Sequence, residues 1–441
     1  MDYSSNSYYR SYKQVVFTAL FFLVFCFTQE LSAKVIGINP PTLLLTAGRI
    51  NALPQAQRIL WKQYEERSHQ QGKIDYALFK NEIHEYKIQS PIVPPESRAK
   101  NVPLDKPANW YSTPKARRIA DIIVSFQTPS GGWGKNLDFT KHLRAPGEFF
   151  SPYNKSQYRP KSSINRYPPF GGTFARDATI TQLRYLAQVL VAVGPDQGAP
   201  YRASFLRGLD YIFSAQYPNG GWPQDWPLEE DYHDGITYKE NAMVNILNLL
   251  SDIVKAKGEF AFIPVSKRAI AAASLKRGIQ CVLATQIIIN GHRTVWCQQH
   301  DALTLIPISA RSYEMPAQVS SESAQIMLFL MKLPNPDPLT VSAVHEAVLW
   351  FEKTKILNVA FKMDAFSGHH LISAPGQGAL WARFYEIGTD RPIFGDPQDP
   401  GRSVHDNVED LSKKCRDGYG WYRESPQKVL KYYYAVWSKE H

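Results

Sequence analysis

Two stretches of the chain carry the same pattern, a glutamine followed six residues later by a tryptophan. The first runs from Gln127 to Trp133 and the second from Gln216 to Trp222, and in both the tryptophan follows two glycines. An indole ring could line a carbohydrate groove by stacking on a sugar face, or it could pack in the core or cap a helix end. The paired glycines allow the chain to turn with positive φ.

The charge balance points to an acidic partner. The chain has 441 residues and a formal net charge of +10 at pH 7. The long-range field of a basic protein attracts polyanions, so acidic polysaccharide, lipopolysaccharide and nucleic acid are the candidates. We expect no nucleic-acid partner, because the sequence contains no helix-turn-helix, zinc-finger or aromatic nucleic-acid motif. A solvated basic surface without a partner is the alternative.

Helical periodicity dominates the chain, whereas strand signals are sparse and short. A third, degenerate copy of the motif runs from Gln286 to Trp296. Repeated helical hairpins must stack to bury their apolar faces. We therefore predict a mainly α fold, an α/α toroid: an incomplete barrel of helical hairpins with long irregular loops that gather at one mouth. The predicted helices are 55–67, 76–86, 114–127, 177–193, 201–215, 239–254, 269–285, 320–332 and 341–355.

The first 33 residues are predicted to be a secretory signal peptide. Arg10 and Lys13 precede an apolar run at 15–27, which is too short to span a bilayer comfortably, and small residues follow at Ser32 and Ala33. An uncleaved anchor is the alternative. We expect a secreted or periplasmic protein with no stable membrane insertion after signal removal. Residues 34–110 then form an N-terminal helical extension and linker, and 111–441 form the toroid domain.

The cysteines predict no disulfide framework. Cys26 lies in the signal segment, and the other three cannot all pair. Cys281 and Cys297 are the nearest in sequence, while Cys415 lies far from both, and no cysteine or histidine cluster has zinc spacing. The core must therefore hold the fold.

Seven blocks of the sequence form an ordered set. They are FQTPSGGWGKNLD (126–138), QYPNGGWPQ (216–224), HDGITYKENAMVNIL (233–247), WCQQHD (296–301), ARSYEMP with SSESAQIM (310–327), LWARFYEIGTDRPIFGD (380–396) and RDGYGWY (416–422). On these blocks the chain resembles the pectate lyases of polysaccharide lyase family 10 from about residue 115 to residue 422. The shorter Gln-to-Trp pattern also resembles the repeat of terpenoid and squalene cyclases, whose acidic catalytic motif is absent.

That family cleaves polygalacturonate by β-elimination, so the resemblance implies a base that removes the C5 proton beside the uronate carboxylate. The implied base is Arg311, although arginine is a poor base by its ordinary pKa, and a structural salt bridge with Glu314 is the alternative. Arg383 and Arg416 resemble substrate-binding arginines, because a guanidinium pairs with a carboxylate through two hydrogen bonds. Calcium is the implied cofactor, bridging protein carboxylates and the substrate uronate.

The sequence departs from the family pattern at the implied metal site. The family's T-x-D-N-x-A-T reads TFARDAT here, so Ala175 replaces the calcium-binding aspartate and Arg176 replaces asparagine. Its Y-N-D-N-A-M reads YKENAM, which puts Lys239 and Glu240 in place of asparagine and aspartate. Pro397 also stands where the family has a substrate-contacting arginine. We expect poor calcium binding, with Glu240 and Asp177 as the candidate ligands and Arg176 and Lys239 as substrate-binding cations.

Two hypotheses follow from these departures. In the first, the protein is a pectate lyase in which Arg176 or Lys239 does part of calcium's electrostatic work. In the second, it is a non-catalytic relative that binds acidic polysaccharide. We expect a monomer in either case.

Overall fold

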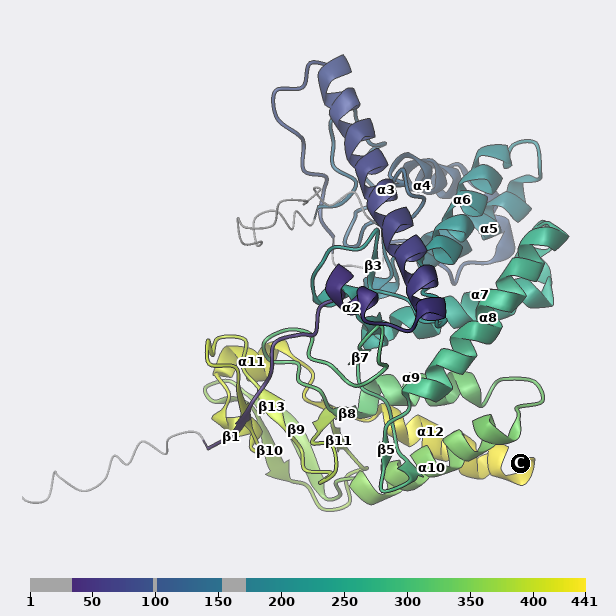
Figure 1. The fold of residues 1–441 in the computed structure, drawn as a ribbon. Helices are drawn as coiled ribbons and strands as arrows, with labels where there is room; N and C mark the ends of the chain where they lie inside the picture. The colour runs from purple at the N-terminus through teal and green to yellow at the C-terminus, as the bar shows by residue number, and fades with distance from the viewer. Residues whose placement is uncertain (1–33, 98–100, 153–171) are drawn as a thin grey trace, which may run out of the picture.

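The computed structural model describes residues 34–97, 101–152 and 172–441, so the predicted signal peptide lies outside the described residues. Successive helices pack as antiparallel neighbours on one shared core (Figure 1). Helix α5 packs on α6, α7 on α8, and α9 on α12. The main helices are α4 (Pro114–Ser125), α5 (Ile180–Val193), α6 (Ala199–Ala215), α7 (Ala242–Lys255), α8 (Val265–Thr285), α9 (Ser320–Leu330), α10 (Pro338–Thr354) and α12 (Ser425–Ala435). The predicted mainly α class is therefore confirmed, while closure into a toroid stays a prediction.

The repeated tryptophans cap helix ends. Each indole N–H donates to a backbone carbonyl near the end of the preceding long helix. The last carbonyls of a helix have no partner within that helix, so the indole satisfies one of them. All of these rings are fully buried, so the capping role holds and groove lining is wrong. A fourth tryptophan, Trp381, makes the same kind of bond. In the sequence a β-hairpin separates it from its helix, so the repeat is not visible there. The bonds are Trp133 to Ile123 (2.7 Å), Trp222 to Ile212 (2.9 Å), Trp296 to Val282 (2.7 Å) and Trp381 to Phe351 (2.9 Å).

The repeated glutamines link each hairpin to the next. The buried amide of Gln216 donates to the carbonyl of Gly220 in its own loop (3.0 Å) and to that of Ser274 in α8 (2.9 Å). Gln127 makes the matching bonds to Gly131 and to Ser204 in α6. Because each amide satisfies carbonyls of two hairpins, the motif fixes how neighbouring repeats stack.

Most strands are pairs of residues that fasten loops, as the sparse strand signals predicted. The exceptions are a hairpin of β9 (Val359–Asp364) with β10 (Gly368–Ser373), and β1 (Val35–Ile38), which pairs with β14 (Ser403–His405) beside β13 (Phe394–Gly395). The remaining strands are β2 (Gly172–Thr173), β3 (Asp225–Trp226), β4 (Ile236–Thr237), β5 (Ile288–Ile289), β6 (His292–Arg293), β7 (Gln299–His300), β8 (Gln318–Val319), β11 (Trp381–Ala382), β12 (Phe384–Tyr385) and β15 (Tyr422–Arg423).

The N-terminal extension contains one long helix where two were predicted. After the short α2 (Ala47–Asn51), α3 runs unbroken over Gln55–Glu85 (Figure 1). Its polar middle, which suggested a break, packs against the body of the protein. The hydroxyl of Ser68 accepts from the Leu228 amide (2.8 Å), and Tyr64 donates to the Ala215 carbonyl (2.9 Å). Tertiary contacts therefore override the weak helical pattern of residues 68–75.

Two helices start three residues later than predicted, at Ile180 and Ala242 instead of at 177 and 239. Positive φ angles at Asp177 (62°) and Asn241 (62°) prevent the α conformation there. The residues before each helix form single tight turns, Ala175–Asp177 and Lys239–Asn241, which contact each other. These turns carry the residues that depart from the family pattern.

The cysteines of the described residues form no disulfide bond. Cys281, Cys297 and Cys415 are buried and unpaired, so Cys281 and Cys297 are not joined. Burial raises the pKa of the Cys281 thiol to about 12.

Among the described residues, no helix is long and apolar enough to cross a membrane. The short α11 (Lys413–Gly418) completes the C-terminal part.

We predict that Gly220→Ala destabilises the protein far more than Gly376→Ala. Both glycines have positive φ, which costs an alanine about 1–2 kcal/mol. A Cβ at Gly220 would lie 2.2 Å from the Arg277 carbonyl oxygen, whereas one at Gly376 would meet nothing within 4 Å. Urea unfolding should place Gly220→Ala at least about 2 kcal/mol below Gly376→Ala. Equal losses would contradict the tight packing of the repeated turn.

Candidate functional site

A buried carboxylate, Glu314, collects two cations and a tyrosine hydroxyl from three parts of the chain. Lys239, in the turn before α7, lies 2.6 Å from its Oε2. Arg311 lies on the same loop, with Nε 3.9 Å from Oε2 and Nη1 donating to the Tyr313 hydroxyl at 2.7 Å. Tyr419 donates to the other oxygen, Oε1, at 2.9 Å. The predicted ion pair of Arg311 with Glu314 is therefore present.

The burial of this cluster shifts its pKa values in opposite directions. Burial alone would raise the pKa of Glu314, but Lys239 and Arg311 lower it to about 2. Burial lowers the pKa of Lys239 to about 8, although Glu314 opposes that shift. Burial would lower the pKa of Arg311 too, but Glu314 and Tyr313 raise it above its ordinary value. Glu314 therefore stays ionised and keeps Arg311 charged.

Arg383 extends the cluster through Tyr419. Its guanidinium lies 4.7 Å from the centre of the Tyr419 ring, a cation–π contact, and pairs with Glu322 at the start of α9. The pair is buried, and Glu322 and Glu314 together raise the pKa of Arg383 against the lowering effect of burial. Three cations thus face two carboxylates, and the one excess positive charge suits an anionic ligand.

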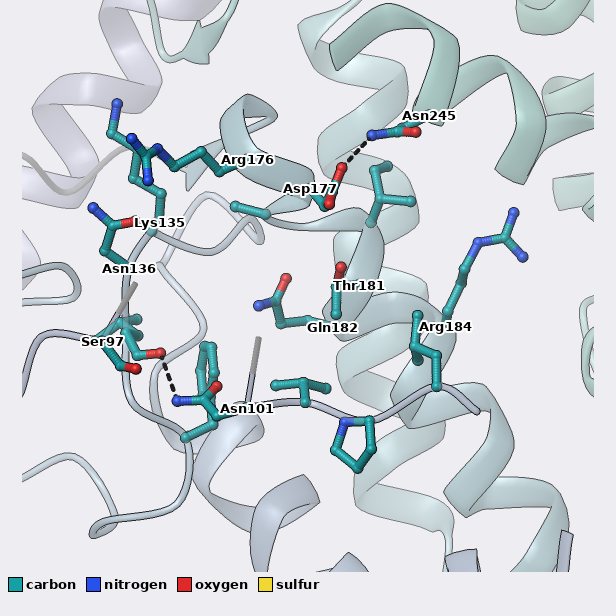
Figure 2. A pocket seen from close by; sticks show the side chains of 18 of the residues that line it. Ser97, Asn101, Lys135, Asn136, Arg176, Asp177, Thr181, Gln182, Arg184 and Asn245 are labelled. Atoms are coloured by element: carbon teal, nitrogen blue, oxygen red, sulfur yellow. Dashed lines mark hydrogen bonds between the residues drawn. The ribbon is translucent and has the colours of Figure 1, made fainter. Parts of the chain in front are cut away.

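A cleft of about 990 Å³ lies beside the two tight turns. Arg176 and Asp177 line it together with Glu240, and Lys135 follows the first Gly-Gly-Trp motif into the same cleft. Figure 2 shows Arg176 directed toward the side of Lys135, and Asp177 directed toward Asn245, whose Nδ2 donates to Asp177 at 2.7 Å. The loops of neighbouring repeats therefore share one cleft, as the stacking of hairpins predicted.

The predicted calcium ligands do not fit calcium. Nε of Arg176 lies 3.9 Å from Glu240 Oε1, so a fixed cation already neutralises this carboxylate. Within the described residues, no group of three acidic or histidine side chains gathers at the cleft. Calcium requires six to eight oxygen ligands, several of them carboxylates. Asp177 and Glu240 line the cleft without forming such a set.

The other predicted residues lie in different settings. The side chain of Lys239 is only 3% exposed and holds Glu314, so its contact with substrate stays a prediction. Arg416 donates to the backbone carbonyls of Glu409, Leu411 and Ser367, which gives it a part in fastening loops. Its predicted contact with substrate is untested. Pro397 is exposed.

The comparisons with known proteins decide the family. The model of the pectic acid lyase family matches residues 127–430. The chain belongs to the pectic acid lyase family. Two solved structures, both of a family 10 polysaccharide lyase from Cellvibrio cellulosa, are similar to it. One is a point mutant in complex with trigalacturonic acid, with 27% identity, a TM-score of 0.63, and coverage of 76% of this chain and 99% of that chain.

The second Cellvibrio structure gives nearly the same figures. It is 26% identical with a TM-score of 0.63, and the match covers 77% of this chain and 98% of that chain. A search of the curated proteins found no match. The match to the pectic acid lyase family begins at Gln127 and ends at Leu430, so it includes Glu314 and its cations and leaves out the N-terminal extension.

That extension nevertheless holds the Arg311 loop of this pectic acid lyase family member. Asn39 is buried, and its Nδ2 donates to the carbonyls of Arg311 (3.1 Å) and Ser312 (2.8 Å). Its Oδ1 accepts from the Ser309 hydroxyl at 2.6 Å. The amide therefore fixes the loop on both sides of Arg311.

Sequence reasoning missed Asn39, Glu322 and Tyr419. Glu322 and Tyr419 lie inside the family blocks SSESAQIM and RDGYGWY, but the sequence pattern assigned no role to either residue. Nothing local marks Asn39, because its partners lie about 270 residues away. Only the pairing of β1 with β14 brings it to the loop.

We predict that Glu314 makes the protein sensitive to acid. Its pKa is lowered from 4.5 to about 2, so its stabilising effect is complete above pH 4.5 and is lost as the pH falls toward 2. This corresponds to about 3 kcal/mol of unfolding free energy. Urea unfolding at several pH values should show this loss in the wild type and not in Glu314→Gln.

At neutral pH, Glu314→Gln should itself cost about 3–5 kcal/mol, because Lys239 stays buried without its counter-charge. The double variant Lys239→Met with Glu314→Gln should recover part of that loss. Glu66→Gln, on the exposed face of α3, serves as the control and should change little. A double variant less stable than both single variants would contradict the pairing.

Proposed function

We propose that the protein is a lyase that cleaves polygalacturonate by β-elimination, with Arg311 at the reacting centre. The single observation that supports this most is the gathering of Arg311, Lys239 and Arg383 around Glu314, inside the region that matches the family. The complex of the Cellvibrio relative with trigalacturonic acid supports the substrate class. Polygalacturonate carries one carboxylate per sugar, which suits the excess of cations.

In this reaction a base removes the C5 proton, the electron pair forms the C4–C5 double bond, and the C4–O bond breaks. Negative charge grows next to the uronate carboxylate, so a cation at that carboxylate lowers the barrier. Arg383 sits rigidly between Glu322 and the ring of Tyr419, which prepares it to bind a carboxylate without reorganising.

Arg311 has two possible tasks. While it keeps its proton, it neutralises the carboxylate; once it loses the proton, it can accept the one on C5. Glu314 and Tyr313 raise its pKa in the free protein, which favours the first task. The second task requires the proton to leave Arg311 for solvent or substrate after substrate binds, while the Tyr313 hydroxyl, 2.7 Å from Nη1, keeps the guanidinium in position.

We further propose that fixed protein cations replace the family's calcium. Arg176 occupies the tight turn where the family pattern has a metal-side residue, and its side chain is 48% exposed at the cleft. A guanidinium there can pair with a uronate carboxylate through two hydrogen bonds. The same proposal includes a secreted or periplasmic location and an incomplete α/α toroid.

The second candidate function is binding of acidic polysaccharide without cleavage. Two observations favour it: the neutralisation of Glu240 by Arg176, and the raised pKa of Arg311. It predicts measurable affinity for polygalacturonate with no unsaturated product.

We predict cleavage that survives a chelator. The purified protein is mixed with polygalacturonate, and the ultraviolet absorbance of the unsaturated product is followed with calcium and then with EDTA. Similar rates in both are expected, because the cleft gathers no three-donor group among the described residues. A rate abolished by EDTA and restored by calcium but not by zinc would show that a calcium site works despite Ala175. Binding without product would favour the second function.

Variants separate the tasks of the arginines. Arg311→Ala should lower kcat at least about 100-fold, the usual scale for losing a proton-transfer group. Arg311→Lys keeps the charge, so retained activity would assign Arg311 to charge neutralisation alone. Arg391→Ala removes an arginine that is paired with Glu386 at 3.0 Å outside the cluster, and it should leave kcat unchanged. Equal rates for all three variants would refute the site.

Asn39→Ala should lower kcat about tenfold with little change in KM, because the loop that carries Arg311 loses three hydrogen bonds while Arg383 stays in place. Lys34→Ala is the matched control, since it removes only an exposed ion pair with Asp406 from the same extension. An equal effect of both variants would mean that the extension acts through stability only.

A further inference from the structure

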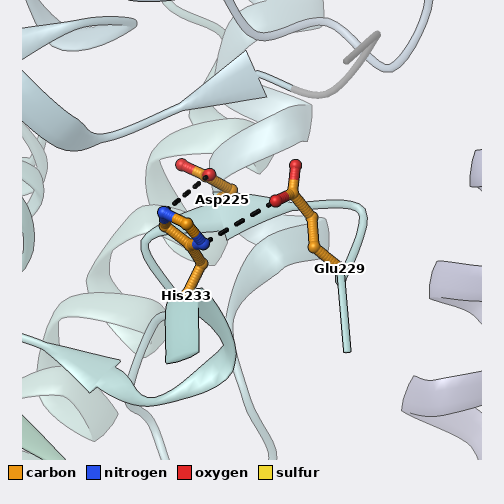
Figure 3. Close-up of side chains that lie close together, drawn as sticks. All are labelled: Asp225, Glu229 and His233. Carbon is orange, nitrogen blue, oxygen red and sulfur yellow. Dashed lines mark ion pairs between the residues drawn. The ribbon is translucent and has the colours of Figure 1, made fainter. Parts of the chain in front are cut away.

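A second cluster of ligating side chains lies on the loop between β3 and β4. Asp225 and Glu229 each place an oxygen, and His233 places a ring nitrogen, so that these donor atoms all lie within 4.8 Å of one another. Figure 3 shows one ring nitrogen of His233 facing Asp225 and the other facing Glu229. These residues are distinct from the Arg311 cluster and from the residues that line the cleft.

The nitrogen that faces Asp225 has no hydrogen-bond partner among the described residues. Nε2 of His233 is buried and makes no hydrogen bond, and its nearest carboxylate oxygen, Asp225 Oδ2, is 3.9 Å away. The side chain is only 5% exposed, so water does not satisfy this atom freely. A buried polar atom without a partner costs about 1–3 kcal/mol, which calls for a ligand at this position.

The opposite ring nitrogen is oriented by a third carboxylate. Nδ1 lies 2.6 Å from Asp231 Oδ1 and 3.7 Å from Glu229 Oε2. A proton on Nδ1, donated to Asp231, leaves the lone pair of Nε2 directed at Asp225. Carboxylates hold metal-binding histidines in this way in many zinc sites. Asp225 is itself held by the Thr173 hydroxyl, which donates to Oδ1.

We infer that Asp225, Glu229 and His233 bind one divalent cation of the zinc type. Zinc accepts both carboxylate oxygen and imidazole nitrogen as ligands, whereas calcium prefers oxygen ligands alone and more of them. Ligands with bonds of about 2.0–2.2 Å in tetrahedral geometry lie about 3.3–3.6 Å apart. The 3.9 Å between Nε2 and Oδ2 needs only a small contraction, whereas Glu229, within 4.8 Å of the other donors, has to turn from the Nδ1 side toward the ion.

The ion would fasten the β3–β4 loop to the start of the adjacent repeat. Asp225 belongs to β3, which pairs with β2, and Thr173 of β2 also accepts from the Ala175 amide at 3.1 Å. The site thus lies behind the turn that carries Arg176 and Asp177. Its ligands are nearly inaccessible to solvent, which suits a structural ion better than a catalytic one.

The test is a zinc titration of the full-length protein after EDTA treatment and dialysis. Calorimetry should show one Zn²⁺ bound per chain, and thermal unfolding should shift to a higher Tm with zinc but not with calcium. Asp225→Asn, Glu229→Gln and His233→Gln should each weaken zinc binding roughly tenfold or more, and Asp231→Asn about tenfold. Glu230→Gln, an exposed neighbour that faces His69, should leave the affinity unchanged.

Three outcomes would overturn the inference: no stoichiometric zinc in the wild type, unchanged affinity in the three ligand variants, or equal binding of calcium at this site. The first of these would identify a cluster of a histidine with carboxylates that binds no metal ion. If Asp225→Asn fails to fold, Glu229→Gln and the wild-type titration still decide. The readout does not involve cleavage, so failure here leaves the proposed lyase function untouched.

Discussion

The buried carboxylate of Glu314 is the interaction on which the candidate site depends. An ionised group in the interior is costly unless charges and hydrogen bonds surround it, and here Lys239, Arg311 and Tyr419 supply them. These partners come from the turn before α7, from the loop before α9 and from the C-terminal segment. One carboxylate therefore ties three distant segments together, and removing it would leave Lys239 buried without its counter-charge.

The helical repeats provide the rigid frame for this cluster. Each tryptophan satisfies a carbonyl at a helix end and each glutamine satisfies carbonyls of two hairpins, so the loops leave the helices in fixed directions. The turns of adjacent repeats then meet, which brings Arg176 within 3.9 Å of Glu240. The cleft is therefore lined by a cation and a carboxylate that pair with each other, one from each turn.

The N-terminal extension is part of the site although it lies outside the region that matches the family. β1 pairs with β14, and Asn39 follows directly and fastens the loop of Arg311. Helix α3 then covers the β3–β4 loop through Ser68. A segment without catalytic side chains can in this way decide the precision of a site, because angstrom-scale displacement of a reacting group costs large factors in rate.

The sequence by itself determined the mainly α class, the repeated helix endings and the family, because periodicity and ordered motifs are local properties of the chain. It also placed Arg311 beside Glu314, since the two residues are three positions apart in one loop. Only the tertiary structure decided that the tryptophans cap helices, that residues 55–85 form one helix, and that Lys239 is buried against Glu314. It alone brought Asn39 to Arg311 and His233 to Asp225, because burial and long-range pairing depend on how distant segments pack, which no local pattern records.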